Sequence, residues 1–404
     1  MNNNSFRGNI LKLMGGTAAV QIINLLVQPI ISRIYDPDNY GVMAVLVSII
    51  AISNVVGFLS YDKAITILDS GEDPFGVAKE LLHKITCLFI IVFICLICYL
   101  IVRNADNVYL ALGVVIVFMT LIDNVFTNLS YKLGMYGKVA KRKIIVVVIN
   151  VLLQVYFGMH GYTKYGMYIA FLLCTFIGVV FIGYEHISKI WNSSSAGYEF
   201  FKKYRRLPLF ELPNNLLNVL SIQLPVFVLA HYVSTSMTGQ YGLASRIVAL
   251  PLLLISSSFS NAYAQKFATM YNNKEDVYSF TKNVWKKIFL LGVIPLLCVG
   301  IFGQQLFVLI FGRDWYIAGK LAQILMLSSF VSLFSASTFF AFVVINKGFI
   351  LTIFGVVSCI LRCIAMLVML QNIFCGIFLM VLFEVAMRLI WLYKLKITLK
   401  ELYI

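Results

Sequence analysis

The sequence predicts an all-α integral membrane protein with twelve transmembrane helices in two six-helix lobes, which form a parallel pseudo-repeat around a central cavity. Three observations lead there: the composition, the number of long apolar runs and an echo between the two halves. Of 404 residues, 61% are hydrophobic and only 12% charged. Soluble globular chains are about half apolar and about one quarter charged. The chain therefore belongs in a bilayer.

Twelve apolar runs are long enough, or nearly so, to cross the roughly 30 Å hydrocarbon core as helices. The first is interrupted by Gln28-Pro29 and ends with Arg33, so we expect it to face a cavity rather than lipid alone. The runs cover roughly 12–34, 40–60, 84–102, 108–128, 144–160, 165–184, 208–232, 239–262, 287–311, 317–345, 348–370 and 374–393.

The basic residues are distributed unevenly between the two sets of links. On this span map, 24 of the 32 Lys and Arg residues lie on one side. Basic residues concentrate in cytoplasmic loops, so both termini are predicted to be cytoplasmic. This rule also accounts for the net charge of +15. With no basic soluble domain, we expect no nucleic-acid partner.

The most strongly charged long link lies at the middle of the chain. We predict an N-terminal lobe of residues 1–184, a cytoplasmic inter-lobe linker of 185–207 and a C-terminal lobe of 208–404. Tyr40-Gly41 is echoed by Tyr241-Gly242, an offset of 201 residues. Each lobe has an even number of spans, so the lobes enter the membrane in the same orientation. Transporters use such parallel repeats to enclose a site at mid-membrane.

Enzymatic and metal-dependent chemistry finds no support in the sequence. No hydrolytic triad or nucleotide-binding glycine loop is present, the four histidines form no metal-ligand pattern, and the eight cysteines lie in or beside apolar runs, where they suit packing. We expect no metal and no cofactor, with a proton or sodium gradient as the candidate energy source.

Cationic side chains at membrane depth are the candidate substrate-binding groups: Arg33, Arg246, Lys320 and Arg362. A guanidinium binds phosphate oxygens bidentately, so Arg33 and Arg246, both in the predicted outer half, suit a phosphate clamp. The alternative for Arg33, Arg246 and Lys320 is an interfacial side chain that extends toward water. For Arg362, the alternative is a structural network with Glu384 and Arg388, which lie four residues apart on one helix face.

Two carboxylates, Asp123 and Glu211, are the proton-coupling candidates. A carboxylate desolvated within a span would have a raised pKa and could carry a proton. A structural hydrogen bond or a local ion pair is the alternative for both residues.

Three stretches of the sequence carry distinctive motifs. The first holds Gln28-Pro29, Arg33, Tyr35 and Tyr40-Gly41, the second is Tyr61-Asp62-Lys63-Ala64-Ile65, and the third is residues 239–251. These stretches resemble the Wzx-type oligosaccharide flippases of the polysaccharide transport family, which often has Glu in place of Asp62, and the third is the most similar of the three. In the half-repeat, Arg246 aligns with Val45, so the lobes differ chemically.

The resemblance implies membership of the superfamily that also contains multidrug extruders and lipid II flippases. It implies a non-enzymatic flippase of the bacterial inner membrane that moves an undecaprenyl-diphosphate-linked oligosaccharide repeat unit to the outer leaflet by alternating access. The product would serve O-antigen, capsule or exopolysaccharide assembly. Besides the glycan and membrane lipid, a polysaccharide polymerase and a chain-length regulator are the implied partners.

Two other functions stay open. A multidrug exporter of the same fold would carry organic cations and favour acidic residues in its cavity, whereas the deep residues here include Arg246, Arg362 and Arg388. A membrane-bound polysaccharide polymerase or acyltransferase would need a large outward loop or a His/Asp catalytic set, and the predicted outward links are all short.

Overall fold

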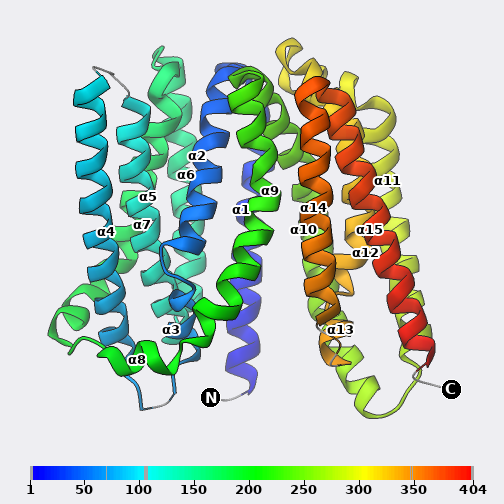
Figure 1. Cartoon of the computed structure of the whole chain (residues 1–404), viewed down its shortest axis with the longest axis horizontal. Helices are drawn as coiled ribbons and strands as arrows, with labels where there is room; N and C mark the ends of the chain where they lie inside the picture. The colour runs from blue at the N-terminus through cyan, green and yellow to red at the C-terminus, as the bar shows by residue number, and fades with distance from the viewer. Residues whose placement is uncertain (1–2, 70, 104–107, 346, 348, 402–404) are drawn as a thin grey trace. The chain divides into compact units, whose positions relative to one another are not determined.

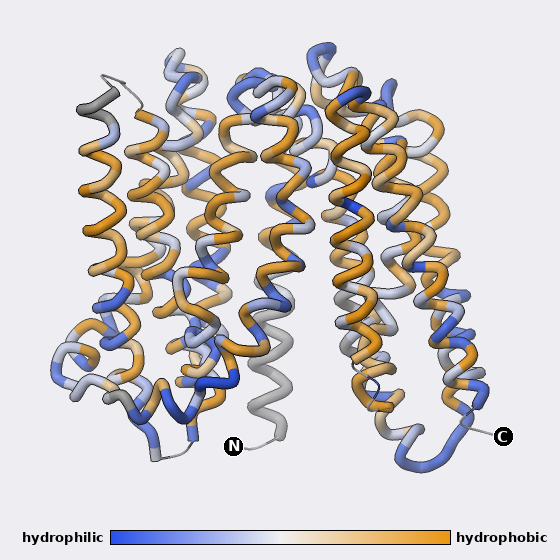
Figure 2. The backbone as a smooth tube through the Cα atoms, viewed as in Figure 1, coloured by the Kyte–Doolittle hydropathy of each residue, from blue (hydrophilic) through white to orange (hydrophobic). Residues whose placement is uncertain are grey.

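The structure is a computed structural model that describes residues 3–69, 71–103, 108–345, 347 and 349–401. Every regular element in these ranges is helical, and twelve helices are long and apolar enough to cross a membrane. The predicted all-α class and the twelve spans are confirmed. Apolar residues run along most of each long helix, whereas hydrophilic residues gather in the connections (Figure 2).

The described residues form two compact units. Unit 1 comprises the chain up to Tyr35 together with Val45–Val219, and unit 2 comprises Asp36–Ala44 and the chain from Leu220 onward. Two helices, α2 (Pro37–Val56) and α9 (Leu212–Tyr232), therefore each contribute residues to both units. These units and the predicted lobes divide the chain differently, so the lobe boundaries stay a prediction, as does a cavity between lobes.

Unit 1 is a bundle of long helices, which run nearly parallel in Figure 1. Short elements join α2 to α4 and α7 to α9. Besides its parts of α2 and α9 it contains α1 (Asn3–Ile34), η1 (Tyr61–Lys63), α3 (Ala64–Ile67), α4 (Pro74–Arg103), α5 (Val108–Lys132), α6 (Tyr136–Met159), α7 (Thr163–Asn192), α8 (Tyr198–Lys203) and the π-helical η2 (Leu207–Glu211).

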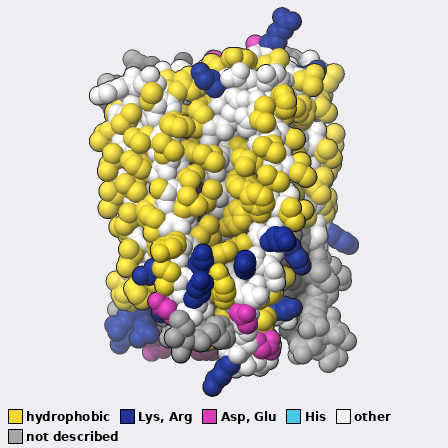
Figure 3. Space-filling view, turned by 90° about the vertical axis from the view of Figure 1, so that its right-hand side faces the viewer, with side chains coloured by type: hydrophobic (Ala, Val, Ile, Leu, Met, Phe, Trp, Pro, Cys, Tyr) yellow, Lys and Arg dark blue, Asp and Glu magenta, His cyan; other side chains and the backbone are white. Residues whose placement is uncertain are grey.

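Unit 2 is a second bundle, and α12 packs against α10, α11 and α15 at its centre. A continuous hydrophobic band covers the face of this unit shown in Figure 3, and most Lys and Arg side chains in that view lie at one end of it. The remaining elements of unit 2 are α10 (Thr235–Asn272), α11 (Val277–Phe311), η3 (Arg313–Trp315), α12 (Tyr316–Ser337), α13 (Phe340–Val344), α14 (Phe349–Gln371) and α15 (Ile373–Glu401).

The end of the first span is fixed by Tyr35. Its side chain is 1% exposed, and its hydroxyl donates to the backbone oxygen of Gln154 at 2.8 Å. An added Cβ on Gly158 would come within 3.2 Å of the Tyr35 ring, and one on Gly166 within 2.7 Å of its hydroxyl oxygen. Burial raises the pKa of Tyr35 to about 12, so the phenol stays a donor. The chain then turns and α2 starts at Pro37, a position that suits proline because the first helical N–H needs no partner.

Two glycines bring the first residues of α2 against the first residues of α10 inside unit 2. A Cβ on Gly41 would lie 1.9 Å from the backbone oxygen of Thr235, and one on Gly239 would lie 1.9 Å from that of Pro37. The two backbones are thus in direct contact, as small residues allow between membrane helices. The Tyr40-Gly41 turn, which suggested an internal repeat, therefore packs against the helix that carries its echo.

The predicted linker is ordered against unit 1. Helix α7 continues to Asn192, and α8 follows after a short irregular stretch. Lys203 Nζ on α8 binds Asp69 Oδ2 at 2.6 Å and Glu72 Oε1 at 2.7 Å. Figure 1 shows α8 at the end of unit 1 where the loop before α4 lies. Contacts thus hold the linker to its own unit.

Candidate functional site

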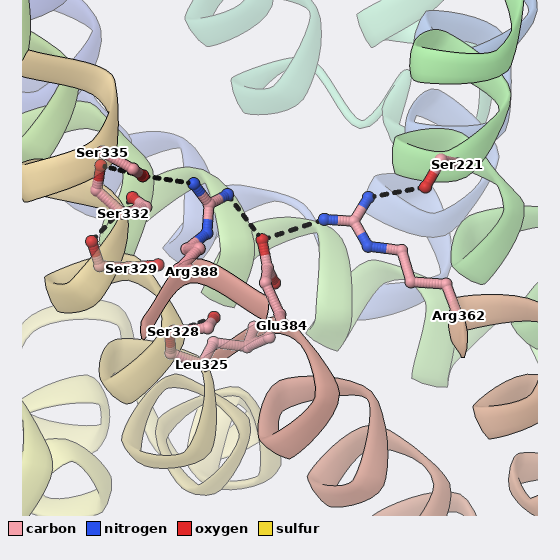
Figure 4. Close-up of polar contacts among 9 residues, drawn as sticks. All are labelled: Ser221, Leu325, Ser328, Ser329, Ser332, Ser335, Arg362, Glu384 and Arg388. Carbon is pink, nitrogen blue, oxygen red and sulfur yellow. Dashed lines mark hydrogen bonds and ion pairs between the residues drawn. The ribbon is translucent and has the colours of Figure 1, made fainter. Parts of the chain in front are cut away.

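A charged network crosses the interior of unit 2 and joins four helices (Figure 4). Glu384 on α15 lies between two guanidinium groups: its Oε1 accepts from Arg362 Nη2 at 2.9 Å and from Arg388 Nη2 at 2.7 Å. Arg362 Nη1 also donates to Ser221 Oγ on α9, and Arg388 Nη1 to Ser335 Oγ on α12, both at 2.9 Å. The predicted contact between Arg362 and Glu384 is confirmed.

This Arg–Glu–Arg network lies far from the ends of its helices. At 1.5 Å per residue, Arg362 is about 20 Å along α14 from Phe349, and Glu384 is about 17 Å along α15 from Ile373. The side chains of Arg362 and Glu384 are each 16% exposed. One carboxylate neutralises one of the two cations, so the network keeps a surplus positive charge at membrane depth, where charged residues are costly and typically mark a functional site.

Arg246 is a further cation of unit 2. It lies on α10, about 17 Å from Thr235 along the helix, and the residue is exposed. The hydroxyl of Tyr40 lies within electrostatic range of it. Tyr40 in turn packs edge-on against Trp315, with ring centroids 4.8 Å apart.

Lys320 occupies the first turns of α12. Its Nζ lies 4.1 Å from the centre of the Phe374 ring on α15, a cation–π contact between neighbouring helices. The side chain is exposed. This contact gives Lys320 a partner within unit 2, and its predicted role in substrate binding stays a prediction.

Arg33 belongs to unit 1 and is exposed at the C-terminal end of α1. Because Arg246 belongs to unit 2, the joint phosphate clamp predicted for these two residues stays a prediction. A basic residue at the C-terminus of a helix also interacts favourably with the helix dipole.

The two predicted proton-coupling carboxylates both form ion pairs. Asp123 on α5 binds Arg142 on α6, whose Nε also donates to the Gly178 backbone oxygen at 3.3 Å. Glu211 lies in η2 with its side chain 45% exposed, and its Oε2 is 2.8 Å from Lys63 Nζ. The predicted alternative, a local ion pair, therefore describes the geometry of both residues; their coupling role stays a prediction.

The sequence did not predict Arg142 as the partner of Asp123, because Arg142 belongs to a basic run that was assigned to a link between spans. The structure starts α6 at Tyr136, which places Arg142 two turns inside the helix with its side chain 8% exposed. The predicted span begins at residue 144, eight residues after the observed start of α6, so the depth of Arg142 could not be predicted. Among the described residues, no group of His, Cys, Asp and Glu side chains is arranged to hold a metal ion.

Residues 30–320 match the family described as "Polysaccharide biosynthesis protein". The chain belongs to this family. No curated protein matches the sequence. The Arg–Glu–Arg network of unit 2 is thus a feature of a multi-pass membrane protein from a polysaccharide biosynthesis family.

Several solved structures of MOP superfamily transporters are similar in fold to this chain. It is similar to the lipid II flippase MurJ in an inward closed conformation, with 11% identity, a TM-score of 0.77, and 95% of this chain and 87% of that chain covered. It is also similar to an inward-facing multidrug resistance MATE family transporter, with 15% identity, a TM-score of 0.70 and 95% of both chains covered.

A third similar structure is a MOP superfamily transporter from Pyrococcus furiosus, described as having a binding pocket of reverse polarity that suggests a different function. The identity is 14%, the TM-score 0.55, and 98% of this chain and 96% of that chain are covered. At these identities the likeness establishes the transporter fold.

Proposed function

We propose that this protein is a flippase that moves an undecaprenyl-diphosphate-linked oligosaccharide from the inner to the outer leaflet of a bacterial inner membrane. The family places the chain in polysaccharide biosynthesis, and the fold is that of transporters and of a lipid flippase. Flipping requires no covalent chemistry. The protein must lower the cost of carrying a charged head group through hydrocarbon.

The observation that carries the proposal is the surplus positive charge of unit 2. The Arg–Glu–Arg network holds two guanidiniums against one carboxylate, and Arg246 adds a third guanidinium on α10. A diphosphate is the anionic part of a polyprenyl-linked sugar, and guanidinium groups bind phosphate oxygens through paired hydrogen bonds. An organic cation would instead meet repulsion at these residues.

In this proposal Arg246 binds the diphosphate in unit 2, where Arg362 and Lys320 are secondary contacts, and the role of Arg33 in unit 1 stays a prediction. Hydroxyls and amides on the same helices contact the glycan, and the polyprenyl tail stays in lipid. Alternating access exposes the site first to the cytoplasm and then to the outside. Both chain ends lie in the cytoplasm, on the side of the basic links.

Arg246→Gln tests the proposal in a cell that depends on this protein for surface polysaccharide. We expect display of the polysaccharide to be lost and lipid-linked repeat units to accumulate on the inner face, while the amount of folded protein is unchanged. Arg246→Lys keeps the charge without the bidentate geometry and should restore part of the display.

Arg313→Gln is the matched control, since Arg313 is also an exposed arginine of unit 2 and lies in η3. It should leave display normal. Normal display from Arg246→Gln would contradict the proposed phosphate contact. Increased sensitivity to cationic drugs in a deletion strain, with normal polysaccharide, would instead favour the multidrug function.

A further inference from the structure

The exposed side of α7 continues past the apolar part of the span into aromatic residues. Tyr184, Ile187 and Trp191 are spaced three and four residues apart, so they lie on one face of the helix. All three are exposed, Tyr184 by 83% and Trp191 by 80%. Tyrosine and tryptophan concentrate where a membrane meets water. The last turns of α7 therefore mark the level of the membrane interface at this end of unit 1.

The segment that follows α7 packs against unit 1 at the same end. Lys79 Nζ of α4 donates to the backbone oxygen of Trp191 at 3.0 Å. On α8, Phe200 is buried in the hydrophobic core of this unit, and the hydroxyl of Tyr61 donates to the Phe201 backbone oxygen at 3.3 Å. Helix α8 and η2 are therefore held at the same end of unit 1 as the last turns of α7 (Figure 1).

Two arginines in this segment differ from several lysines around them. Those lysines are engaged by carboxylates or by an aromatic ring of unit 1, and they are Lys63, Lys84, Lys138 and Lys203. Arg205 and Arg206 lie between α8 and η2 and are both exposed. Within the described part of the chain, no carboxylate forms an ion pair with either arginine. Both guanidiniums are thus available to an anion from outside the chain.

Two exposed apolar side chains follow the arginines directly. Leu209 and Phe210 lie in η2 and are 63% and 72% exposed. Basic groups beside large exposed apolar groups are typical of a segment that lies in a membrane interface, with the charge among the head groups and the apolar side chains in the acyl region. An anion in solution, such as a nucleotide, would leave Leu209 and Phe210 uncovered. A lipid matches both features of the segment.

We propose that residues 205–210 form a binding site for an anionic phospholipid of the leaflet at this end of unit 1. The two guanidiniums bind the phosphate of the head group, because their forked N–H donors fit its oxygens bidentately. Leu209 and Phe210 contact the first carbons of the acyl chains. The charge distribution of the sequence predicts this end to be cytoplasmic, and anionic lipids give that leaflet a negative surface potential. Since η2 leads into α9, the bound lipid fixes the start of α9 at the interface.

Photo-crosslinking of the full-length protein in nanodiscs tests this site. The probe is phosphatidylglycerol that carries a diazirine near its head group, diluted into phosphatidylcholine, and mass spectrometry maps the labelled residues. We expect label within 205–210 of the wild type and several-fold less in the double variant Arg205→Gln, Arg206→Gln. The same diazirine on phosphatidylcholine should label this segment several-fold less than phosphatidylglycerol does. Equal labelling by the two lipids, or of the wild type and the double variant, would overturn the proposal.

The double variant Lys394→Gln, Lys396→Gln is the matched control. Both lysines are exposed on α15 in unit 2, so this variant loses the same net charge as the arginine variant. Label within 205–210 should stay at the wild-type level. A loss as large as that of the arginine variant would show that the net charge of the protein alone attracts the lipid, and it would contradict a site at 205–210.

Two further variants keep the test decisive if the arginine variant does not fold. Arg205→Lys with Arg206→Lys keeps both charges and should keep most of the label. Leu209→Gln with Phe210→Gln keeps both arginines but removes the apolar contacts, and it should lower the label several-fold. Label at the wild-type level in this second variant would show that the apolar pair does not contact the lipid and would contradict the proposed site.

Competition identifies which phosphate-bearing lipid occupies the site. Unlabelled phosphatidylglycerol in excess should displace the probe, whereas undecaprenyl diphosphate at the same concentration should displace less of it. Stronger displacement by undecaprenyl diphosphate would assign the site to a polyprenyl lipid and contradict the phospholipid assignment. Because labelling requires no transport, these outcomes do not depend on the flippase function proposed above.

Discussion

Glu384 is the residue on which the charged network of unit 2 depends. Its single oxygen Oε1 accepts hydrogen bonds from both Arg362 and Arg388, and its side chain is 16% exposed. Removing the carboxylate leaves two partly buried guanidiniums that repel each other. Breaking a buried ion pair by removing one partner costs about 3–5 kcal/mol.

Glu384→Gln should therefore lower the free energy of unfolding by about 3 kcal/mol, toward the smaller end because the site is not fully dry. Thermal unfolding of the protein in detergent measures this as a fall in Tm. Glu401→Gln, an exposed carboxylate at the end of the same helix, should leave Tm within error. Equal Tm values for the two variants would show that the network contributes nothing to stability.

At the residue scale the sequence identified part of this site. Glu384 and Arg388 are four residues apart in an apolar run, and Arg362 lies at a similar depth in the preceding run, so their contact could be predicted. Ser221 and Ser335 could not be assigned to it, because they come from α9 and α12 and only the packing of unit 2 brings them there. Arg142 was missed because its depth depends on where α6 begins.

At the scale of helices, the contact between α2 and α10 depends on two glycines. A Cβ at Gly41 would meet the Thr235 backbone oxygen at 1.9 Å, and a backbone atom cannot move aside as a flexible side chain can. Overpacking a well-packed site typically costs about 1–3 kcal/mol. The start of α2 would then have to move away from α10.

Gly41→Ala should lower Tm by an amount corresponding to about 3 kcal/mol. Gly300→Ala is the matched control: it lies inside α11, and a Cβ there would meet nothing within 4 Å. It should raise stability by about 0.5–1 kcal/mol, because alanine loses less backbone entropy in a helix. A shift of Tm in the same direction for both variants would contradict the direct backbone contact between α2 and α10.

The attachment of α8 to unit 1 predicts a pH dependence. Burial tends to raise the pKa of Glu72, but hydrogen bonds from Lys203 and Tyr204 outweigh it and hold that pKa below the usual 4.5. A carboxylate with a lowered folded-state pKa contributes stability that is fully present above the unfolded value and is lost as pH falls through the folded value.

Amide hydrogen exchange in α8, corrected for intrinsic rates, should therefore increase as pH falls below 4.5. Glu72→Gln should show the faster exchange at neutral pH as well and lose the pH dependence. Glu401→Gln serves as control, because Glu401 ends α15 in unit 2, whereas Glu72 and α8 belong to unit 1. An exchange rate in α8 that changes neither with pH nor in Glu72→Gln would contradict the attachment of α8 to unit 1.

The existence of the helices was predictable, but several of their ends were not. Long apolar runs gave the twelve spans, because hydrocarbon requires every backbone group to be satisfied within its own helix. Polar turns at the helix ends have no such constraint, so α7 extends to Asn192 and α11 starts at Val277, within stretches that looked like links. Charge alone also could not show that the link carrying α8 binds Asp69 and Glu72.

At the scale of the whole molecule, the chain is a multi-pass membrane protein of a polysaccharide biosynthesis family, and its fold is shared by solved transporter structures. The all-helical membrane fold could be anticipated from the composition and the spans. The arrangement of the two lobes around a central cavity stays a prediction, because periodicity within a helix does not fix how one bundle meets another. The sequence does not identify the sugars of the glycan either, because hydroxyl and amide side chains serve helix packing as well as sugar binding.

The central claim is that this protein carries a polyprenyl-diphosphate glycan across a bilayer. The most direct measurement follows a fluorescent glycan of this class in proteoliposomes, with an impermeant quencher reporting the fraction in the outer leaflet. We predict that wild-type protein equilibrates the glycan between leaflets at least tenfold faster than protein-free vesicles, and that Arg246→Gln does not. Equal rates for wild-type and protein-free vesicles, with the protein folded and correctly inserted, would contradict it.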